Sequence, residues 1–278
     1  NKYRGRSMRI DIVSLFPEFF DAFFSHSIIK RAIEAGRLDM AVTNPRDFSH
    51  NKHGQVDDTP YGGGAGMLMM APPIFEAVES VASNYDSAIN GNYETDEICD
   101  EMSLIGNPSE SIRRRVIFMG PTGQPFTQEK ARELATYDQL VLICGHYEGV
   151  DYRVEEHLVD ETISIGDYVL TGGELPAMVV ADAVARMIPG VLGAASGAQE
   201  DSFYEPLLEC PQYTKPPEFR GWVVPDILRS GHHKNIATWR QKEALKRTRL
   251  LRPDLLERPL TKEEVKLLKE IVEEESRL

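Results

Sequence analysis

The amino-acid sequence predicts an α/β fold, a mostly parallel sheet with helices on both faces, followed by a small all-α domain. Short apolar segments alternate with segments of helical periodicity over residues 8–188, an order typical of parallel sheets built from strand–helix–strand units. Beyond Val224 the sequence shows helical patterns and no strand pattern. We therefore expect the sheet in the first part of the chain and a helical module at its end.

The expected elements follow in a regular order. Pro17 is expected to open the first helix, Gly36 to end it at the C′ position, and Thr127 to cap a later helix. The expected strands are residues 8–16, 38–43, 115–119, 139–144 and 161–165. The other expected helices are residues 72–82, 151–159, 176–188, 235–251 and 261–274. Residues 44–70 form a long polar loop, which in a compact domain usually has a functional reason.

The chain is expected to divide into two domains and a linker. Residues 1–7 precede Met8, which looks like the natural start, and are interpreted as an expression remnant or a short leader. Residues 8–192 form the α/β domain, and its acidic residues 83–110 are interpreted as an insertion with the composition of mobile segments. Residues 193–204 are small and polar, as in an interdomain linker, and residues 205–278 form the helical domain.

Composition and charge restrict the class of protein. No apolar run reaches the length of a membrane span and no signal-peptide pattern occurs, so a cytoplasmic protein is expected. Cys99, Cys144 and Cys210 lack a CxxC spacing, which argues against a disulfide framework and a zinc ribbon. The net charge of −13 disfavours a nonspecific polyanion binder, yet residues 229–252 carry a local balance of +7, with eight Lys or Arg and Glu243.

Three glycine clusters follow strand patterns, at residues 120–123, 145–149 and 166–173. In an open parallel sheet the loops at the carboxyl ends of the strands form the ligand crevice. Glycine lets the backbone approach a ligand closely because it has no Cβ. Each cluster alone could be only a tight turn. Three clusters after consecutive strands predict a ligand site, although they do not identify the ligand, and neither a GxGxxG nor a P-loop pattern occurs.

Seven longer motifs make the pattern specific. They are YGGGAGMLM (61–69), GPTGQPF (120–126), CGHYEGVDYRV (144–154), SIGDYVLTGGELPAM (164–178), RMIPGVLG (186–193), EDSF (200–203) and CPQYTKP (210–216). With these motifs in this order, the chain resembles the bacterial tRNA (guanine-N1)-methyltransferases. The resemblance runs from residue 8 to about residue 274, apart from the insertion.

The resemblance implies a knotted methyltransferase of the SPOUT type, whose sheet ends in a C-terminal trefoil knot. Topology rules alone would predict an unknotted sheet. It also implies that the knot loops bind S-adenosylmethionine in a bent form, at a site completed in a homodimer. The residues matched to this cofactor site are Met119, Pro121, Gly145, Tyr147, Glu148, Gly149, Ser164, Ile165, Gly166, Asp167, Tyr168, Val169, Leu170, Gly172, Gly173 and Pro176.

The implied reaction transfers a methyl group to N1 of guanine at tRNA position 37, next to the anticodon, when another guanosine precedes it. N1 carries a proton near neutral pH, so a catalyst needs a base near N1, a cation near O6 and in-line geometry. By resemblance Asp201 is the general base, Arg186 stabilises O6, and Glu148 is a carboxylate near the cofactor. Without the resemblance, these residues would be interpreted as a helix cap, a surface arginine and an exposed turn acid.

The expected partner is the tRNA anticodon stem-loop, whose target base must be splayed out to be reached. By resemblance, the glycine-rich loop at residue 61 lies near the target guanine. The basic segment 229–252, with Trp239, suits phosphate contacts on a folded RNA, although such a segment is more often a solvated helix face. The expected substrate-binding residues are Tyr61, Gly62, Gly63, Arg229, Lys234, Arg240 and Lys246.

Two questions stay open at this point. His50, His53, Asp57 and Asp58 could be interpreted as metal ligands, but a polar loop is the favoured interpretation because no helix pattern places the two His on one face. The resemblance implies magnesium assistance, and no motif identifies a metal site. Two other functions are a methyltransferase acting on another RNA and a non-catalytic RNA-binding protein.

The chain departs from the family pattern at two places. His146 stands where the family commonly has Arg, which replaces a fixed charge by a titratable one. Residues 195–202 also differ slightly, which bears on how the segment around Asp201 is ordered.

Overall fold

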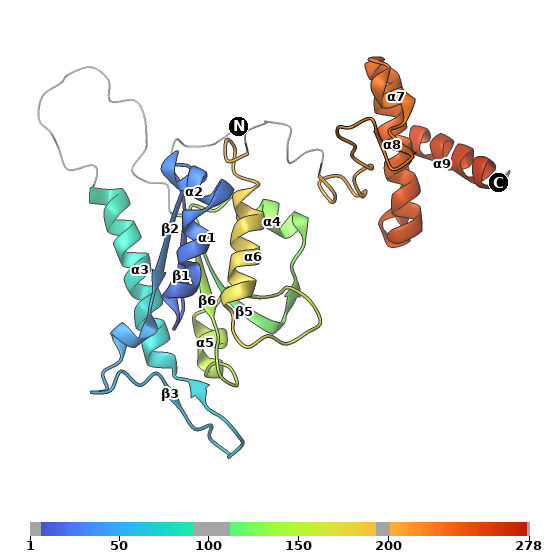
Figure 1. Cartoon of the computed structure of the whole chain (residues 1–278). Helices are drawn as coiled ribbons and strands as arrows, with labels where there is room; N and C mark the ends of the chain where they lie inside the picture. The colour runs from blue at the N-terminus through green and yellow to red at the C-terminus, as the bar shows by residue number, and fades with distance from the viewer. Residues whose placement is uncertain (1–6, 92–111, 193–200, 277–278) are drawn as a thin grey trace, which may run out of the picture. The chain divides into compact units, whose positions relative to one another are not determined.

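The computed structural model describes residues 7–91, 112–192 and 201–276. The chain forms two compact units, Asn1–Gly193 and Ala194–Leu278 (Figure 1). Residues 1–6, residues 92–110 of the expected insertion and residues 193–200 of the expected linker lie outside the described residues.

The first unit is built on a five-stranded sheet with the strand order β2-β1-β6-β5-β7. All four neighbouring pairs are parallel, so the predicted parallel sheet is confirmed. Every residue of the central strand β6 is buried, as expected for a parallel sheet covered on both faces. The strands are β1 (Met8–Val13), β2 (Leu38–Thr43), β5 (Arg114–Pro125), β6 (Gln139–Cys144) and β7 (Glu161–Ser164).

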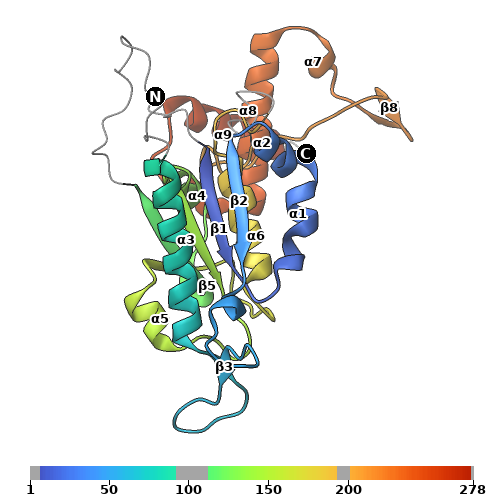
Figure 2. The same ribbon diagram turned by 90° about the vertical axis from the view of Figure 1, so that its left-hand side faces the viewer.

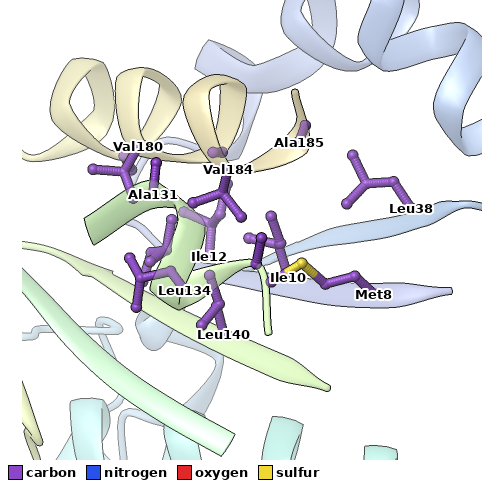
Figure 3. Packing of buried hydrophobic residues seen from close by; sticks show 14 of the residues in the cluster. Met8, Ile10, Ile12, Leu38, Ala131, Leu134, Leu140, Val180, Val184 and Ala185 are labelled. Atoms are coloured by element: carbon purple, nitrogen blue, oxygen red, sulfur yellow. The ribbon is translucent and has the colours of Figure 1, made fainter. Parts of the chain in front are cut away.

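Helices cover both faces of the sheet, as predicted; Figure 2 shows α3 in front of the sheet and α6 behind it. On the α6 face, Val184 points toward Ile12 of β1, and Val180 lies beside Ala131 (Figure 3). On the α3 face, Ile74 packs with Val141 of β6 in a second core. Successive strand residues therefore supply two separate cores. These helices are α2 (Ser27–Glu34), α4 (Gln128–Leu134) and α6 (Glu174–Ala185) on one face, and α3 (Ala71–Gly91) and α5 (Tyr152–His157) on the other.

The helix predicted to begin at Pro17 is broken into three pieces, η1 (Pro17–Phe20), α1 (Asp21–Ser25) and α2. Between α1 and α2, Ser27 has a φ of 55°. The Ser25 hydroxyl donates to the Asp21 carbonyl, and the His26 ring contacts the Ala22 carbonyl. Such local side-chain bonds compete with the helical ladder, which explains the break. Gly36 follows the end of α2 with a φ of 62°, as predicted.

Helix α3 is longer than predicted and continues to Gly91, so residues 83–91 of the expected insertion are helical. Tyr85 donates its hydroxyl to the Asp138 carbonyl, and Asp86 forms an ion pair with Arg114 at the start of β5. These contacts hold the added turns against the sheet. The long loop before α3 contains η2 (Pro45–Phe48), β3 (Asp57–Asp58) and β4 (Leu68–Met69).

The second unit is helical, but it also contains a short hairpin, so the prediction of an all-α domain is corrected here. The hairpin turn has positive φ at both Arg220 and Gly221, the geometry that a two-residue turn needs. Leu245, Leu267 and Ile271 form the small core of the second unit. Its elements are β8 (Glu218–Phe219), β9 (Trp222–Val223), α7 (Asp226–Arg229), α8 (His233–Leu251), η3 (Pro253–Leu256) and α9 (Lys262–Glu275).

Candidate functional site

The glycine-rich segment within β5 and the glycine-rich loops that follow β6 and β7 surround one cavity at the carboxyl end of the sheet. Its empty space, including the open mouth, is about 670 Å³. All the residues matched to the cofactor site line this cavity except Asp167, which is exposed nearby. The lining also includes Phe118, Gly120, His146, Ile163 and Thr171.

Gly120, His146 and Thr171 lie in the glycine clusters that the sequence predicts to form a ligand site, although the motif match did not assign them to the cofactor. Phe118 and Ile163 were missed because the motif match singled out individual positions. Each of them is a sequence neighbour of a predicted one. A prediction from the whole of each strand end and loop would have found them, since the loop backbone as well as chosen side chains forms the wall.

The loop of residues 166–173 can cross the end of β6 only because it contains Gly173. The Gly173 amide donates to the Gly145 carbonyl over 2.9 Å. A Cβ at residue 173 would lie 2.6 Å from the Cα of Cys144, closer than van der Waals contact allows. The glycine thus brings two of the three loops into direct backbone contact.

A register shift in β5 shapes the third loop. The pairing of β5 with β7 is interrupted between Met119 and Gln124. An interrupted ladder of this kind bends the strand and turns residues out of the sheet. Residues 120 and 121, which line the cavity, lie within this interruption.

Ionisable side chains are few in the cavity wall. His146 is half-buried and Glu148 is exposed, and the lining contains no Lys, Arg or Asp. Cys144 lies behind the wall, where burial raises the pKa of its thiol well above the ordinary value, with a further contribution from Glu174. A thiol held in its neutral form is a poor nucleophile, so the cavity does not suit cysteine catalysis.

The glycine-rich loop of residues 61–69 is attached to the cavity wall. The Glu148 amide donates to the Met67 carbonyl over 3.1 Å, and the Met69 amide donates to the Gly149 carbonyl over 3.0 Å. The Asp151 amide then donates back to Met69 over 2.9 Å. Tyr61 near the loop tip is fully exposed. The structure therefore brings the predicted substrate loop, with Gly62 and Gly63, beside the predicted cofactor residues.

The two predicted catalytic residues belong to different units. Arg186 is the half-buried C-cap residue of α6 in the first unit. Asp201 belongs to the second unit, where its carbonyl accepts the Tyr204 amide in a turn. It is not the N-cap of a helix. A second cavity in that unit is lined by Asp201, Cys210 and Arg240, among others.

Several cations of the basic segment form ion pairs, and Arg229 is both exposed and within 3.7 Å of the Asp226 carboxylate. Lys242 and Arg249 of α8 form ion pairs of 2.6 Å with Glu274 and Glu275 of α9. The four predicted tRNA-binding cations of this segment are exposed, and they are Arg229, Lys234, Arg240 and Lys246.

Residues 50–56 form a loop, and Asp57 and Asp58 form the short strand β3. The His50 ring contacts the Glu76 carboxylate at 2.8 Å. Among residues 7–91, 112–192 and 201–276, no group of three or more His, Cys, Asp or Glu side chains is placed to hold a metal ion. Over the same ranges, no helix is long and apolar enough to cross a membrane.

Comparison with known proteins gives consistent matches over nearly the whole chain. The family model described as tRNA (Guanine-1)-methyltransferase TrmD matches residues 8–258. A tRNA (guanine-N(1)-)-methyltransferase of Desulforamulus reducens is 54% identical over 95% of this chain and 95% of its own. Proteins with the same name from Dehalococcoides mccartyi strain CBDB1 (50% identical, 97% of this chain and 99% of its own) and Brevibacillus brevis (53%, 96% and 99%) are similar at comparable levels.

Proposed function

The chain belongs to the tRNA (guanine-1)-methyltransferase family, and we propose from this membership that it methylates N1 of guanine at tRNA position 37. The methyl donor in this proposal is S-adenosylmethionine. The relatives are named for methylation of guanine N1 in tRNA; the position next to the anticodon is the finer part of the proposal.

One observation supports the donor site above all others. Residues that are distant in the sequence, in β5 and in the loops after β6 and β7, converge on one cavity. The walls combine apolar side chains such as Ile165 and Leu170 with loop backbone that can bind the edge of a purine. The buried Nδ1 atom of His146 has no hydrogen-bond partner within the described residues, and a polar ligand could satisfy it.

The residues that line the cavity would hold S-adenosylmethionine, and the cofactor would supply an electrophilic methyl group there. Asp201 accepts the N1 proton of guanine, and Arg186 stabilises the negative charge that develops on O6. Removal of this proton leaves negative charge on the guanine, so the cation near O6 is essential to the proposal. Magnesium is a second candidate for this charge stabilisation.

The knot and the homodimer remain part of the proposal. Tyr168, Val169 and Leu170 on the cavity loop are exposed, as are Leu175 and Val179 of α6. An exposed apolar surface of this kind supports coverage by a second copy of the chain. The close crossing of residues 173 and 144 is compatible with a threaded chain. Exposed Lys and Arg of α8, together with the Tyr61 loop, would contact the tRNA in a cytoplasmic enzyme.

Methyl transfer to two tRNA transcripts tests the proposed function. With labelled S-adenosylmethionine, a transcript with G at position 37 should be methylated and one with A should not. Equal labelling of both would contradict the assignment, and nuclease digestion of the product would locate the methyl group. A methyl group found on another atom or another RNA would favour the alternative methyltransferase.

The role of Asp201 is tested by Asp201→Asn. This change should leave S-adenosylmethionine affinity nearly intact and reduce turnover severely, because it removes the base without removing cavity contacts. Glu209→Gln, an exposed acid in the same segment, is the matched control and should behave as the unmodified protein. Near-normal turnover of Asp201→Asn would remove Asp201 from the base role.

A further inference from the structure

The short hairpin of the second unit carries two large aromatic side chains in solvent. Phe219 of β8 lies directly opposite Trp222 of β9, so both side chains leave the same face of the two-stranded ribbon. Their ring centroids are 6.2 Å apart, with the ring planes at 49°. Phe219 is 55% exposed and Trp222 is 69% exposed, and Figure 2 shows the hairpin extending away from the helices of the unit. The hairpin therefore holds an aromatic pair in place without burying it.

The backbone of the hairpin fixes the position of this pair. Arg220 and Gly221 have φ values of 55° and 82°, as a tight two-residue turn requires. Beyond the strands, the Val224 amide donates to the Pro217 carbonyl over 2.9 Å. One exposed cross-strand pair stabilises a two-stranded ribbon only modestly. Two adjacent large rings left in solvent therefore indicate a contact surface rather than a packing role.

Arg220 adds a positive charge beside the aromatic pair. Its guanidinium carbon lies over the Phe219 ring, 5.1 Å from the ring centroid, a distance typical of a cation–π contact. Arg220 is itself exposed, so its N–H groups remain open to a ligand. The hairpin thus presents an aromatic face at Trp222 and a cation at its turn.

An unpaired nucleobase suits this combination better than a protein surface does. Proteins that bind unpaired RNA stack its bases on aromatic rings and place cations beside the phosphates. A stable protein interface needs about 20–30 residues on each side, whereas the exposed surface here consists of Phe219, Arg220 and Trp222. The size and the charge of the surface therefore both favour a single base with its neighbouring phosphate.

We propose that Trp222 stacks on an unpaired base of the RNA substrate, and that Arg220 contacts a phosphate next to that base. This inference rests on the proposed tRNA substrate and adds a contact outside the cavity of the first unit and outside α8. Every base has an aromatic face, so stacking is tolerant of sequence. The contact adds affinity for unpaired RNA and does not select the atom that is methylated.

The fluorescence of Trp222 reports the stacking directly. The chain contains two tryptophans, so Trp239→Phe leaves Trp222 as the single one. Titration of this full-length variant with a tRNA anticodon stem-loop should quench the emission to a plateau, because a stacked base lies against the indole ring. A duplex RNA of equal length should quench it much less, since its bases are already stacked. Unchanged emission at saturating stem-loop, with binding followed by anisotropy of labelled RNA, would overturn the inference.

Two substitutions of Trp222 separate stacking from the stability of the hairpin. Trp222→Ile keeps the β-branched preference of a strand and removes the aromatic face, whereas Trp222→Phe keeps an aromatic face. Trp222→Ile should raise the Kd for the stem-loop about 5- to 150-fold, the range for stacking of one base, and Trp222→Phe should restore most of the affinity. Val223→Ala, at an exposed position of the opposite face, is the control and should leave the Kd unchanged.

Three results with these variants would contradict the stacking contact. Unchanged RNA binding by Trp222→Ile would overturn it. Equal losses in Trp222→Ile and Val223→Ala would assign the effect to the stability of the hairpin and would overturn it as well. Loss of self-association in sedimentation, with unchanged RNA binding, would assign the hairpin to a protein contact instead.

The salt dependence of binding tests the phosphate contact of Arg220. Arg220→Asn suits the φ of 55°, because asparagine tolerates the left-handed conformation. This change should reduce the slope of log affinity against log salt concentration by about 0.7–0.9, the value for one phosphate. Trp222→Ile should leave the slope as it is. An unchanged slope for Arg220→Asn would overturn the phosphate contact.

Methyl transfer distinguishes failure of this inference from failure of the proposed function. Trp222→Ile should raise the KM for tRNA by about the factor found in binding, and Val223→Ala should methylate tRNA as the unmodified chain does. Methylation of guanine at position 37 with the same KM in Trp222→Ile would overturn the stacking contact and leave the proposed function intact. No tRNA binding by the unmodified chain would overturn both.

Discussion

Replacing Glu264 by Gln should remove a pH-dependent part of the stability of the second unit. Glu264 is buried in the first turn of α9, where it completes a capping box with Thr261. Its carboxylate accepts hydrogen bonds of 2.6 and 3.2 Å from Arg258 and one of 2.7 Å from the Thr261 amide. The Arg258 contact is the largest cause that lowers the pKa of Glu264 from 4.5 to about 2, against the opposing effect of burial.

The size of the effect follows from that pKa. At about 1.4 kcal/mol per pH unit, lowering it from 4.5 to about 2 is worth about 3 kcal/mol at neutral pH. Because the folded-state pKa is depressed, this contribution is complete above the unfolded pKa and is lost as the pH falls from about 4.5 towards 2. At pH 3.5, about 1.4 kcal/mol of it should be gone.

Tryptophan fluorescence isolates this unit, since both tryptophans of the chain, Trp222 and Trp239, belong to it. Urea unfolding of the full chain should show Glu264→Gln less stable at pH 6. The difference in unfolding free energy from the unmodified protein should shrink by about 1.4 kcal/mol at pH 3.5. Glu273→Gln, an exposed position of the same helix, should show a constant difference. If the difference in unfolding free energy between Glu264→Gln and the unmodified protein is the same at both pH values, the reasoning is refuted.

Three further predictions concern the first unit. Gly173→Ala should weaken S-adenosylhomocysteine binding at least tenfold in calorimetry and lower the melting temperature, because its Cβ would collide with the backbone of Cys144; unchanged binding would contradict the crossing described above. Gly66→Ala should reduce methyl transfer to tRNA about tenfold, since misplacement of site groups is costly and the new Cβ would collide with the Glu148 side chain. Gly54 also has a positive φ but has open space around it, so equal activities of Gly54→Ala and Gly66→Ala would argue against this cause. Cys144 should resist iodoacetamide at pH 8 in the folded protein, because burial raises its pKa, and react after unfolding; peptide mapping by mass spectrometry would reveal early labelling as the contrary result.

The parts of the fold that were predictable are those that depend on local sequence. Residues 139–144 form a continuous apolar run, and β6 has the same bounds. Thr127 accepts the Lys130 amide as the N-cap of α4, as its position before a helical pattern predicts. In both cases neighbouring residues alone decide the conformation.

The predicted helix boundaries are wrong where contacts between distant residues, or local side-chain bonds to the backbone, determine the conformation. The acidic, polar residues after Ala82 lack the pattern of a helix, yet Tyr85 and Asp86 gain partners from β5 and the turn before β6. Such tertiary contacts override weak local preference. The break at Ser27 has a local cause. The apolar spacing on both sides predicts one continuous helix, but side-chain bonds to the backbone just before Ser27 interrupt it.

The sequence predicts that the candidate site is a crevice, but it does not predict which residues of the loops lie against one another there. The glycine clusters indicate where the backbone approaches a ligand, and the cavity forms there. Nothing in the sequence places residue 173 against the backbone of Cys144, because this close approach depends on how the loop containing Gly173 crosses the end of β6. Neighbours set by chain crossing require the three-dimensional structure.

The distribution of charge explains how an acidic chain can suit an RNA partner. The net charge of −13 acts weakly beyond the screening distance of about 8–10 Å at physiological salt. An RNA phosphate closer than this distance meets mainly the local charges of the protein. On α8, Lys242 and Arg249 form ion pairs with acids of α9, whereas Lys234, Arg240 and Lys246 are exposed. The charge available to phosphates is therefore smaller than the local balance of +7 suggests, and it is confined to a few positions. Binding that depends on a few phosphate contacts has a shallow salt dependence, so on the proposed function we expect most of the specificity for tRNA to come from the target base and the loop of residues 61–69.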